Sequence, residues 1–527
     1  MIEHLPFFFT IIVLIVLLNI WANKLKIAYP ILLVIAGLGI SFIPELPILH
    51  IDPDLIFFIF LPPLLFEASW SVSLKEMKKW WRIIGSFAFL VVFFTAFLVA
   101  IVSNHIIPGF SIALGFVLGG IVSPPDAVST GAITKFVKIP KSTSAILEGE
   151  SLLNDASSLI IFRFALITVG TGQFIWQEAI VDFVWMLIGG VGIGLIIAWI
   201  FMQAHKRLAT DAPSDIILTL IAPYIMYYVA EEMHCSGVLA VVCGGLFMSS
   251  NQLKFLASSS RLKGFNFWES FVFLLNGLVF FIIGLGLPEI VAGIKSNGIP
   301  IETAIGYGVI VTIVLILARM ISSYTAMFST MIFRPQVAHS MNFSRRTFLT
   351  PLALGWTGMR GVVSLAAALS IPLKLNGEPF PYRNLILFVT FVVILLTLVI
   401  QGLTLPYIIN KYKPFLGLEQ QEKDEAEMHM QIKKGLKQHV YIHIKEKYER
   451  DWIGHAGMER VLKHWEEQAN SQDVRWIDDN IKVVLLEMFE IQRDYLNELN
   501  KDPEINEELI RQQIHQIDLE EERIRFV

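Results

Sequence analysis

Long apolar runs separated by short polar loops fill most of the chain. Thirteen of these runs are long enough, or nearly so, to cross about 30 Å of hydrocarbon as a helix. They cover residues 7–27, 30–45, 54–72, 82–106, 110–136, 143–170, 176–205, 213–232, 235–250, 268–288, 303–330, 348–373 and 383–408. The pattern predicts an all-α integral membrane protein of about 13 transmembrane helices.

Basic residues test this count, because cytoplasmic loops carry an excess of Lys and Arg. The loops between the spans fall into two alternating sets, one on each side of the membrane. One set holds 17 basic residues, and the other set holds three, Lys295, Lys374 and Arg383. The 17 are Lys24, Lys26, Lys75, Lys78, Lys79, Arg82, Lys135, Lys138, Lys141, Lys206, Arg207, Lys254, Arg261, Lys263, Arg334, Arg345 and Arg346. The asymmetry predicts a multi-pass protein of the cell membrane with its N-terminus outside and its C-terminus in the cytoplasm.

The fifth and twelfth spans contain residues that interrupt helices. Ser123-Pro124-Pro125 lies in the fifth span, and Gly358 and Gly361 lie in the twelfth. Two six-helix repeats, spans 1–6 and 8–13 joined by span 7, place each broken helix fifth in its repeat. Equivalent spans, such as the fifth and the twelfth, are seven apart. Because seven is odd, the two repeats cross the membrane in opposite directions. Paired broken helices in inverted repeats point to the binding site of a secondary transporter.

Charged residues lie inside three of the apolar spans. Glu150, Asn154 and Asp155 precede an almost wholly apolar stretch, Asp126 follows the double proline, and Arg360 lies between the glycines of the twelfth span. An ionised group at bilayer depth is costly without a partner, so such residues mark ion or proton pathways. A buried acid and a buried base can also neutralise the partial charges at the ends of half-helices.

Oxygen atoms suitable for a small hard cation gather around Asp155. Ser151 and Asp155 share one helix face because they are four residues apart, and Asn154 is adjacent. Carbonyl groups near Ser123 lose their helical partners to the prolines. Such oxygens suit Na⁺, and a carboxylate can instead take a proton. The sequence therefore predicts that cation and proton compete for Asp155, with Ser151 as a further Na⁺ ligand.

Charge divides the chain into two predicted domains. Residues 410–527 hold 44 of the 87 charged residues, so we expect a transmembrane domain at 1–409 and a cytosolic helical tail at 410–527. The two cysteines, Cys235 and Cys243, indicate no disulfide framework. No zinc spacing, phosphate-binding loop or dinucleotide fingerprint is present in the sequence. We expect no cofactor, no nucleic-acid partner and no enzyme activity.

Three motifs resemble those of the sodium/proton exchanger family. They are Glu150-Ser151-Leu152-Leu153-Asn154-Asp155, Ser123-Pro124-Pro125-Asp126 and Gly358-Met359-Arg360-Gly361. The likeness is to the monovalent cation:proton antiporter group with an Asn-Asp pair, in its bacterial branch, and it covers about residues 1–410. It implies 13 helices, a homodimer, and a core domain that moves against a dimerisation domain.

The resemblance also implies roles for single residues. Asp155 would bind the cation or the proton, Asn154 would hold it in place, and Ser151 would add an oxygen. Glu150 and Arg360 would form a buried structural ion pair near a helix crossover that Asp126 supports. The Asn-Asp form of the pair is associated with electroneutral exchange.

The resemblance says less about the roles of three further residues. Glu67 matches a carboxylate that borders the cation path in some relatives. Arg163 lies eight residues after Asp155, about 12 Å along a helix, so it would pair elsewhere, with Glu67 as one candidate. The sequence departs from many relatives at Pro125, where they have Thr. The substitution removes a hydroxyl and an N–H group from the expected cation shell.

Two other functions compete with the antiporter that exchanges Na⁺, or Li⁺ or K⁺, for H⁺. A cation channel would need a continuous pore, whereas broken helices and buried ion pairs suit alternating access. An intramembrane hydrolase could use Asp126 and Asp155, but Asn154 and Arg360 would then be unexplained. Purely structural roles compete at single positions, above all for the paired charges Glu150 and Arg360.

Overall fold

The computed structural model divides into two compact units, Met1–Leu418 and Glu419–Val527. In the first unit it describes residues 5–43, 53–126, 131, 141–173, 176–208, 211–296, 298–333, 345–375 and 377–416. In the second it describes only residues 427, 435, 438, 442, 486, 489, 492, 493, 496, 516, 517, 519, 520 and 521.

Helices make up almost all of the described part of the first unit. They are α1 (Leu5–Leu25), α2 (Tyr29–Ile40), α3 (Pro53–Ser71), α4 (Leu74–Gly85), η2 (Ser86–Val91), α5 (Val92–Ile106), α6 (Ile112–Val122), α8 (Lys141–Thr171), α9 (Trp176–Arg207), α10 (Ala212–Glu232), α11 (Gly237–Asn251), η3 (Gln252–Lys254), α12 (Ser258–Leu285), α13 (Leu287–Ser296), α14 (Ile301–Phe333), α16 (Arg345–Trp356), α17 (Val362–Leu369), α18 (Arg383–Leu396), η4 (Thr397–Gln401) and α19 (Gly402–Leu416). A two-stranded antiparallel ribbon joins β1 (Lys374–Leu375) to β2 (Glu378–Pro379), with Lys374 opposite Pro379.

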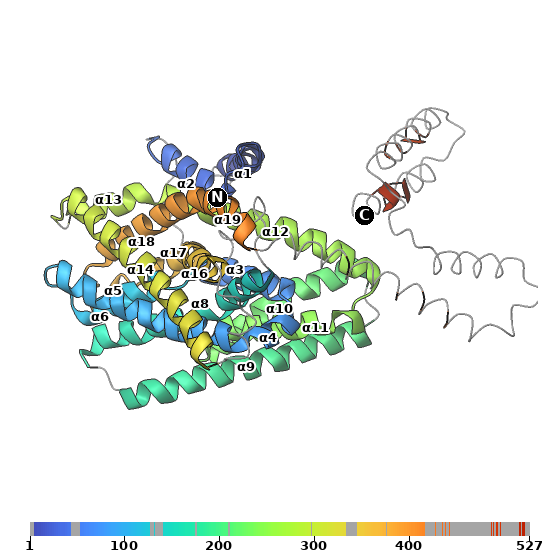
Figure 1. Ribbon diagram of the computed structural model, residues 1–527, viewed down its shortest axis with the longest axis horizontal. Helices are drawn as coiled ribbons and strands as arrows, with labels where there is room; N and C mark the ends of the chain where they lie inside the picture. The colour runs from blue at the N-terminus through green and yellow to red at the C-terminus, as the bar shows by residue number, and fades with distance from the viewer. Residues whose placement is uncertain are drawn as a thin grey trace, which may run out of the picture. The chain divides into compact units, whose positions relative to one another are not determined.

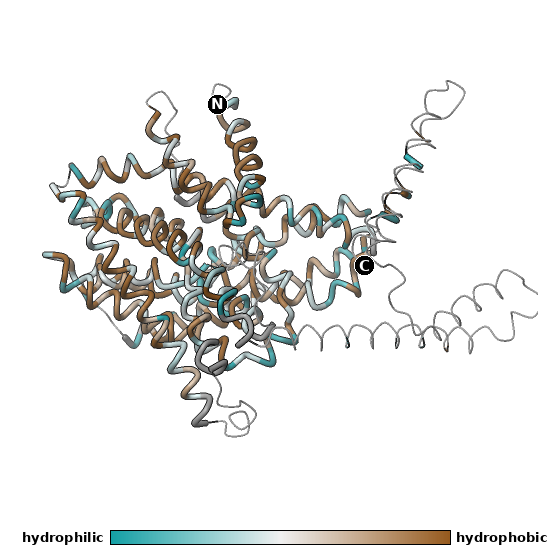
Figure 2. The backbone as a smooth tube through the Cα atoms, turned by 45° about the horizontal axis from the view of Figure 1, so that its top comes forward, coloured by the Kyte–Doolittle hydropathy of each residue, from teal (hydrophilic) through white to brown (hydrophobic). Residues whose placement is uncertain are grey.

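Eight helical runs among the described residues are long and apolar enough to cross a membrane. They are Pro6–Leu25, Leu74–Ile106, Thr143–Thr171, Ala179–Arg207, Ala212–Glu232, Ser259–Lys295, Ile301–Ser329 and Arg383–Lys411. Three shorter apolar helical stretches add to them, Tyr29–Ile40, Phe58–Ser71 and Ile112–Val122. Apolar residues run along most of the length of these helices (Figure 2). The prediction of a helical membrane protein is confirmed at this level.

Side-chain caps explain where several helices begin. Ser73, Ser111 and Ser236 each accept a hydrogen bond from the backbone N–H three residues later, at the starts of α4, α6 and α11. Asp211 caps α10 in the same way, through the N–H of Ser214 at 3.1 Å. Such caps satisfy one of the backbone donors that a helix start leaves without an internal partner.

The helices pack into two bundles. The first bundle consists of α1, α2, α3, α9, α10, α11 and α12, and the second consists of α4, η2, α5, α6, α8, α13, α14, α16, α17, α18, η4 and α19. Contacts are most extensive within each bundle, as between α9 and α11 in the first and between α6 and α8 in the second. The helices α8, α16 and α17 lie near the centre of the view in Figure 1.

Both helix breaks expected from the sequence are present. The helix α6 ends at Val122, and residues 123–126 after it are not helical. The helix α16 ends at Trp356, and α17 begins at Val362 after five residues, of which 358–361 have no regular structure. Apart from Gly131, the later part of the fifth predicted span, 127–136, lies outside the described residues.

The second unit shows helical structure at each of its described positions. Phe489 and Ile517 are buried, and Arg493 forms an ion pair with Glu521. These contacts join two segments of the unit that are far apart in sequence. The role of a cytosolic tail that the sequence suggests for this region stays a prediction.

Candidate cation site at the helix crossover

The two helix breaks meet each other through their backbones. The N–H of Asp126 donates a hydrogen bond to the carbonyl of Met359, with 2.7 Å between nitrogen and oxygen. Pro124 and Pro125 have no N–H to donate, and no helix continues past Ser123. Non-helical backbone at membrane depth is tolerated only where protein buries it or where it lines a cavity. Ser123 and Arg360 are indeed buried, at 2% and 1% exposure.

Gly361 allows this close approach. A Cβ atom at Gly361 would lie 2.1 Å from Oδ2 of Asp126 and 2.5 Å from its Cγ. No side chain tolerates such distances, so any residue larger than glycine must displace the Asp126 carboxylate. The glycine series of the twelfth span therefore has a steric reason at this position.

Gly361→Ala tests this packing. We expect the added methyl group to push Asp126 away, to destabilise the protein by about 1–3 kcal/mol, as overpacking does, and to reduce any transport through this site. The matched control is Gly192→Ala on α9, where a Cβ would meet nothing within 4 Å. Thermal unfolding of both purified variants in detergent provides the measurement. Equal unfolding temperatures for the two variants would contradict the steric argument.

The crossover places a charge at each of two helix ends. Nε of Arg360 donates to the carbonyl of Val122 at 2.5 Å, at the negative C-terminal end of α6, and its Nη1 donates to the carbonyl of Gly358 at 2.6 Å. The Asp126 carboxylate lies against Gly361, which is the N-cap of α17 and the positive end of that helix. Each charge thus opposes the partial charge of the helix end beside it, as the sequence suggested.

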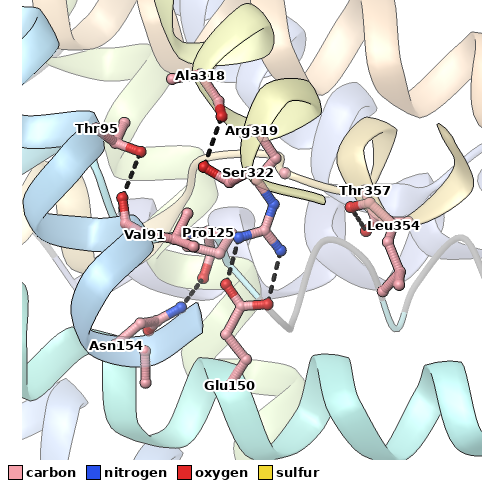
Figure 3. Close-up of polar contacts among 12 residues, drawn as sticks. Val91, Thr95, Pro125, Glu150, Asn154, Ala318, Arg319, Ser322, Leu354 and Thr357 are labelled. Carbon is pink, nitrogen blue, oxygen red and sulfur yellow. Dashed lines mark hydrogen bonds and ion pairs between the residues drawn. The ribbon is translucent and has the colours of Figure 1, made fainter. Parts of the chain in front are cut away.

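The helix α8 brings Asn154 and Asp155 to this crossover. Nδ2 of Asn154 donates to the carbonyl of Pro125 at 3.3 Å, which Figure 3 shows. The hydroxyl of Ser157 donates to the carbonyl of Ala88 in η2 and anchors this turn of α8. Asn154 is completely buried, and Asp155 is 6% exposed. Pro125, where the sequence departs from many relatives, therefore contributes its carbonyl oxygen to holding Asn154.

Several buried oxygen atoms here have no hydrogen-bond partner within the described part of the chain. They include Oδ1 of Asn154 and the hydroxyl of Ser123. The structure also gives no hydrogen bond or ion pair between the Asp155 carboxylate and any described residue. Asp126 is near enough to Asp155 for the two negative charges to repel. Ser151 lies one turn earlier on α8 and is half-buried. Buried oxygens without partners among the described residues, next to two carboxyl groups, suit a cation.

Glu150 pairs with Arg319 of α14, so the expected pairing with Arg360 is wrong. Both oxygens of Glu150 accept hydrogen bonds from Arg319, the Oε2–Nη2 pair at 2.7 Å (Figure 3). Exposure is 3% for the Arg319 side chain and zero for Glu150. The two arginines flank Gly358, where a Cβ would lie 3.1 Å from Cδ of Arg319 and 3.3 Å from Nη1 of Arg360. Arg360 donates its hydrogen bonds to the carbonyls of Val122 and Gly358. Arg319 is therefore the arginine that pairs with the Glu150 carboxylate.

Arg163 pairs with Glu231 of α10, and the suggested partner Glu67 is therefore wrong. Glu67 instead accepts a hydrogen bond from the hydroxyl of Ser71 at 2.9 Å. It lines a cavity of about 540 Å³ together with Trp70, Asp215, Trp268, Glu269 and other residues of α3, α10 and α12. Sequence reasoning overlooked Glu231, although its place at the end of an apolar run was a signal.

The chain belongs to the sodium/hydrogen exchanger family. The family model described as sodium/hydrogen exchanger, transmembrane, matches residues 10–411. One relative is the sodium, potassium, lithium and rubidium/H⁺ antiporter of Bacillus pumilus, 33% identical over 399 residues, which cover 74% of this chain and 59% of the relative. The antiporter of the same description from Bacillus subtilis is 33% identical over 388 residues, covering 72% of this chain and 57% of that one. The chain thus spans less than two thirds of the length of either relative.

A solved structure supports the same fold. The sodium proton antiporter MjNhaP1 from Methanocaldococcus jannaschii, determined at pH 8, superposes with a TM-score of 0.61 at 18% sequence identity. The match covers 78% of this chain and 98% of that one. The two chains therefore share one fold over most of their lengths.

Proposed function

We propose that the chain exchanges a monovalent cation for H⁺ across the cell membrane as a secondary antiporter. The observation that carries this proposal is the Asp155 carboxylate, which is buried at the helix crossover and makes no hydrogen bond or ion pair with the described residues. A buried carboxylate that no described residue neutralises suits the uptake of a positive charge from solution, either a proton or a cation.

Competition for one carboxylate couples the two ions. Asp155 binds the cation with oxygens of Ser151 and of the crossover, and Asn154 stays fixed through Pro125. When a proton binds Asp155, the site loses the charge that a cation needs. One Asp155 carries one positive charge in either direction, so the exchange is electroneutral. Asp126, Glu150, Arg319 and Arg360 hold the crossover and do not carry ions.

Alternating access follows from movement of the two bundles against each other. The second bundle carries α6, α8, α16 and α17, and therefore the whole crossover, whereas the first bundle carries α3, α10 and α12 with Glu67 and its cavity. Movement of the second bundle as a body would expose Asp155 to one side of the membrane at a time without disturbing the contacts around it.

The finer features predicted from the sequence belong to the same proposal. They are 13 spans in two inverted repeats, an outside N-terminus with a cytoplasmic C-terminal tail, and a homodimer. The 17-to-3 distribution of basic residues supports the orientation. The long apolar helix α1 leaves Phe9, Val13 and Trp21 exposed, at 60%, 58% and 65%, which suits contact with lipid or with a second copy of the chain.

Ion flux in proteoliposomes tests the proposed function. We expect an imposed gradient of Na⁺ to drive H⁺ in the opposite direction, at a rate that an applied membrane voltage does not change. Parallel gradients of Li⁺, K⁺ and Rb⁺ establish the preference, since the Bacillus relatives are described as antiporters of all four cations. Cation flux without opposing H⁺ flux, or single-channel currents in planar bilayers, would overturn the proposal in favour of a channel.

A further inference from the structure

An ion pair joins the two bundles close to the site. Arg163 lies on α8, in the second bundle, and its guanidinium binds the Glu231 carboxylate of α10, in the first bundle. Arg163 is eight residues beyond Asp155 on the same helix, about 12 Å along the axis. A movement of the second bundle that carries Asp155 also carries Arg163.

The structure holds Glu231 in place from the other side. Oε1 of Glu231 accepts a hydrogen bond from the backbone N–H of Gly237 at 3.1 Å, while Oε2 binds Arg163. Gly237 is the first residue of α11, which packs extensively against α9 and α3 in the first bundle. The carboxylate is therefore a fixed part of the first bundle, and Arg163 is the partner that moves.

Exposure separates this ion pair from the buried pair inside the second bundle. The side chains of Arg163 and Glu231 are 41% and 28% exposed, against 3% and 0% for Arg319 and Glu150. Half-exposed ion pairs contribute little net stability because water solvates both partners when they part. Such a pair can open and close repeatedly, whereas separating a buried pair leaves uncompensated charge.

The pair lies toward one end of the helices, and a polar cavity lies toward the other. Glu231 is next to the last residue of α10, while Asp215, near the start of α10, lines the cavity with Glu67. In the proposed orientation α10 runs from the cytoplasm outward, so the ion pair lies toward the outer side and the cavity toward the cytoplasmic side.

We propose that Arg163 and Glu231 form the outer gate of the antiporter, an ion pair between the bundles that is closed while Asp155 faces the cytoplasm and must part when Asp155 turns outward. The proposal assigns both residues to the transport cycle as positioning residues, since neither binds the transported ion. It rests on the proposed function, because a gate is needed only where access alternates.

Reversible cross-linking tests whether the pair must part. In a Cys235→Ala/Cys243→Ala background, Arg163→Cys and Glu231→Cys would be joined by a bifunctional methanethiosulfonate, and exchange measured in proteoliposomes. We expect cross-linking to lower exchange to the level of protein-free vesicles, and a reducing agent to restore it.

The matched control is the pair Gly293→Cys and Asn384→Cys. These two positions join α13 and α18 within the second bundle, where Nδ2 of Asn384 donates to the Gly293 carbonyl at 3.2 Å. Cross-linked control protein should keep most of its exchange.

Charge reversal in the otherwise native chain gives a second test. Arg163→Glu and Glu231→Arg should each slow exchange, and the two together should restore much of the rate by remaking the pair with its charges swapped. Exchange that survives cross-linking at 163 and 231, or a double reversal no better than either single one, would overturn the gate. Failure of the unmodified protein to exchange ions would instead overturn the proposed function, so the two failures are distinguishable.

Discussion

Asp155→Asn is expected to abolish cation/proton exchange, to the background of protein-free vesicles, while the protein reaches the membrane in normal amount. The amide has almost the same shape as the carboxylate, so packing at this buried position changes little. It can neither take up a proton near neutral pH nor offer a negative charge to a cation. A cation would then enter the low-dielectric interior without a counter-charge, at a cost that the remaining oxygens do not offset.

Asp211→Asn is the matched control for this prediction. Asp211 is exposed at the start of α10 and caps that helix through the N–H of Ser214, and asparagine caps helices about as well as aspartate. We expect its exchange rate to equal that of the unmodified chain. Proton flux driven by a Na⁺ gradient, normalised to the amount of reconstituted protein, measures both variants. Exchange by Asp155→Asn at the unmodified rate would remove Asp155 as the ion carrier.

Local chemistry made much of the crossover predictable. Proline has no N–H, so Pro124 and Pro125 had to end a helix, and the structure ends α6 just before them. The glycines beside Arg360 indicated a second break, which the structure places between α16 and α17. Apolar length predicted a helical membrane protein, and eight helical runs among the described residues are long and apolar enough to cross a membrane. Each of these inferences depends only on residues that are close together along the chain, so each could be made from the sequence alone.

Pairing between distant segments was not predictable in the same way. Arg163, Arg319 and Arg360 all lie in apolar stretches, and composition alone could not decide which of them faces Glu150. The choice depends on the position of α14, which lets Arg319 reach Glu150 of α8, and on the carbonyls of Val122 and Gly358, to which Arg360 donates instead. The partner of Arg163 likewise depends on where α10 ends beside α8.

The buried pair of Glu150 and Arg319 provides the second large expected effect. Removing one partner of a fully buried ion pair leaves an uncompensated charge and costs about 3–5 kcal/mol. Both Glu150→Gln and Arg319→Gln should therefore lower the unfolding temperature and the yield of folded protein sharply. The remaining Arg319 charge would also lie beside Arg360, with Gly358 between them, and repulsion between the two would strain the crossover.

The double variant Glu150→Gln/Arg319→Gln should be more stable than either single variant, because no unpaired charge remains and the two amides can hydrogen-bond with each other. Glu148→Gln is the control: this residue lies two positions earlier on α8, is exposed, and accepts a hydrogen bond from the hydroxyl of Ser144 at 2.7 Å. Surface substitutions of this kind change stability by about 0.5 kcal/mol or less. The measurement is the unfolding temperature of the two single variants, the double variant and the control, all in the same detergent. If Glu150→Gln unfolds at the temperature of Glu148→Gln, the pair does not stabilise the crossover, and Asn154 and Pro125 must hold Asp155 in place without it.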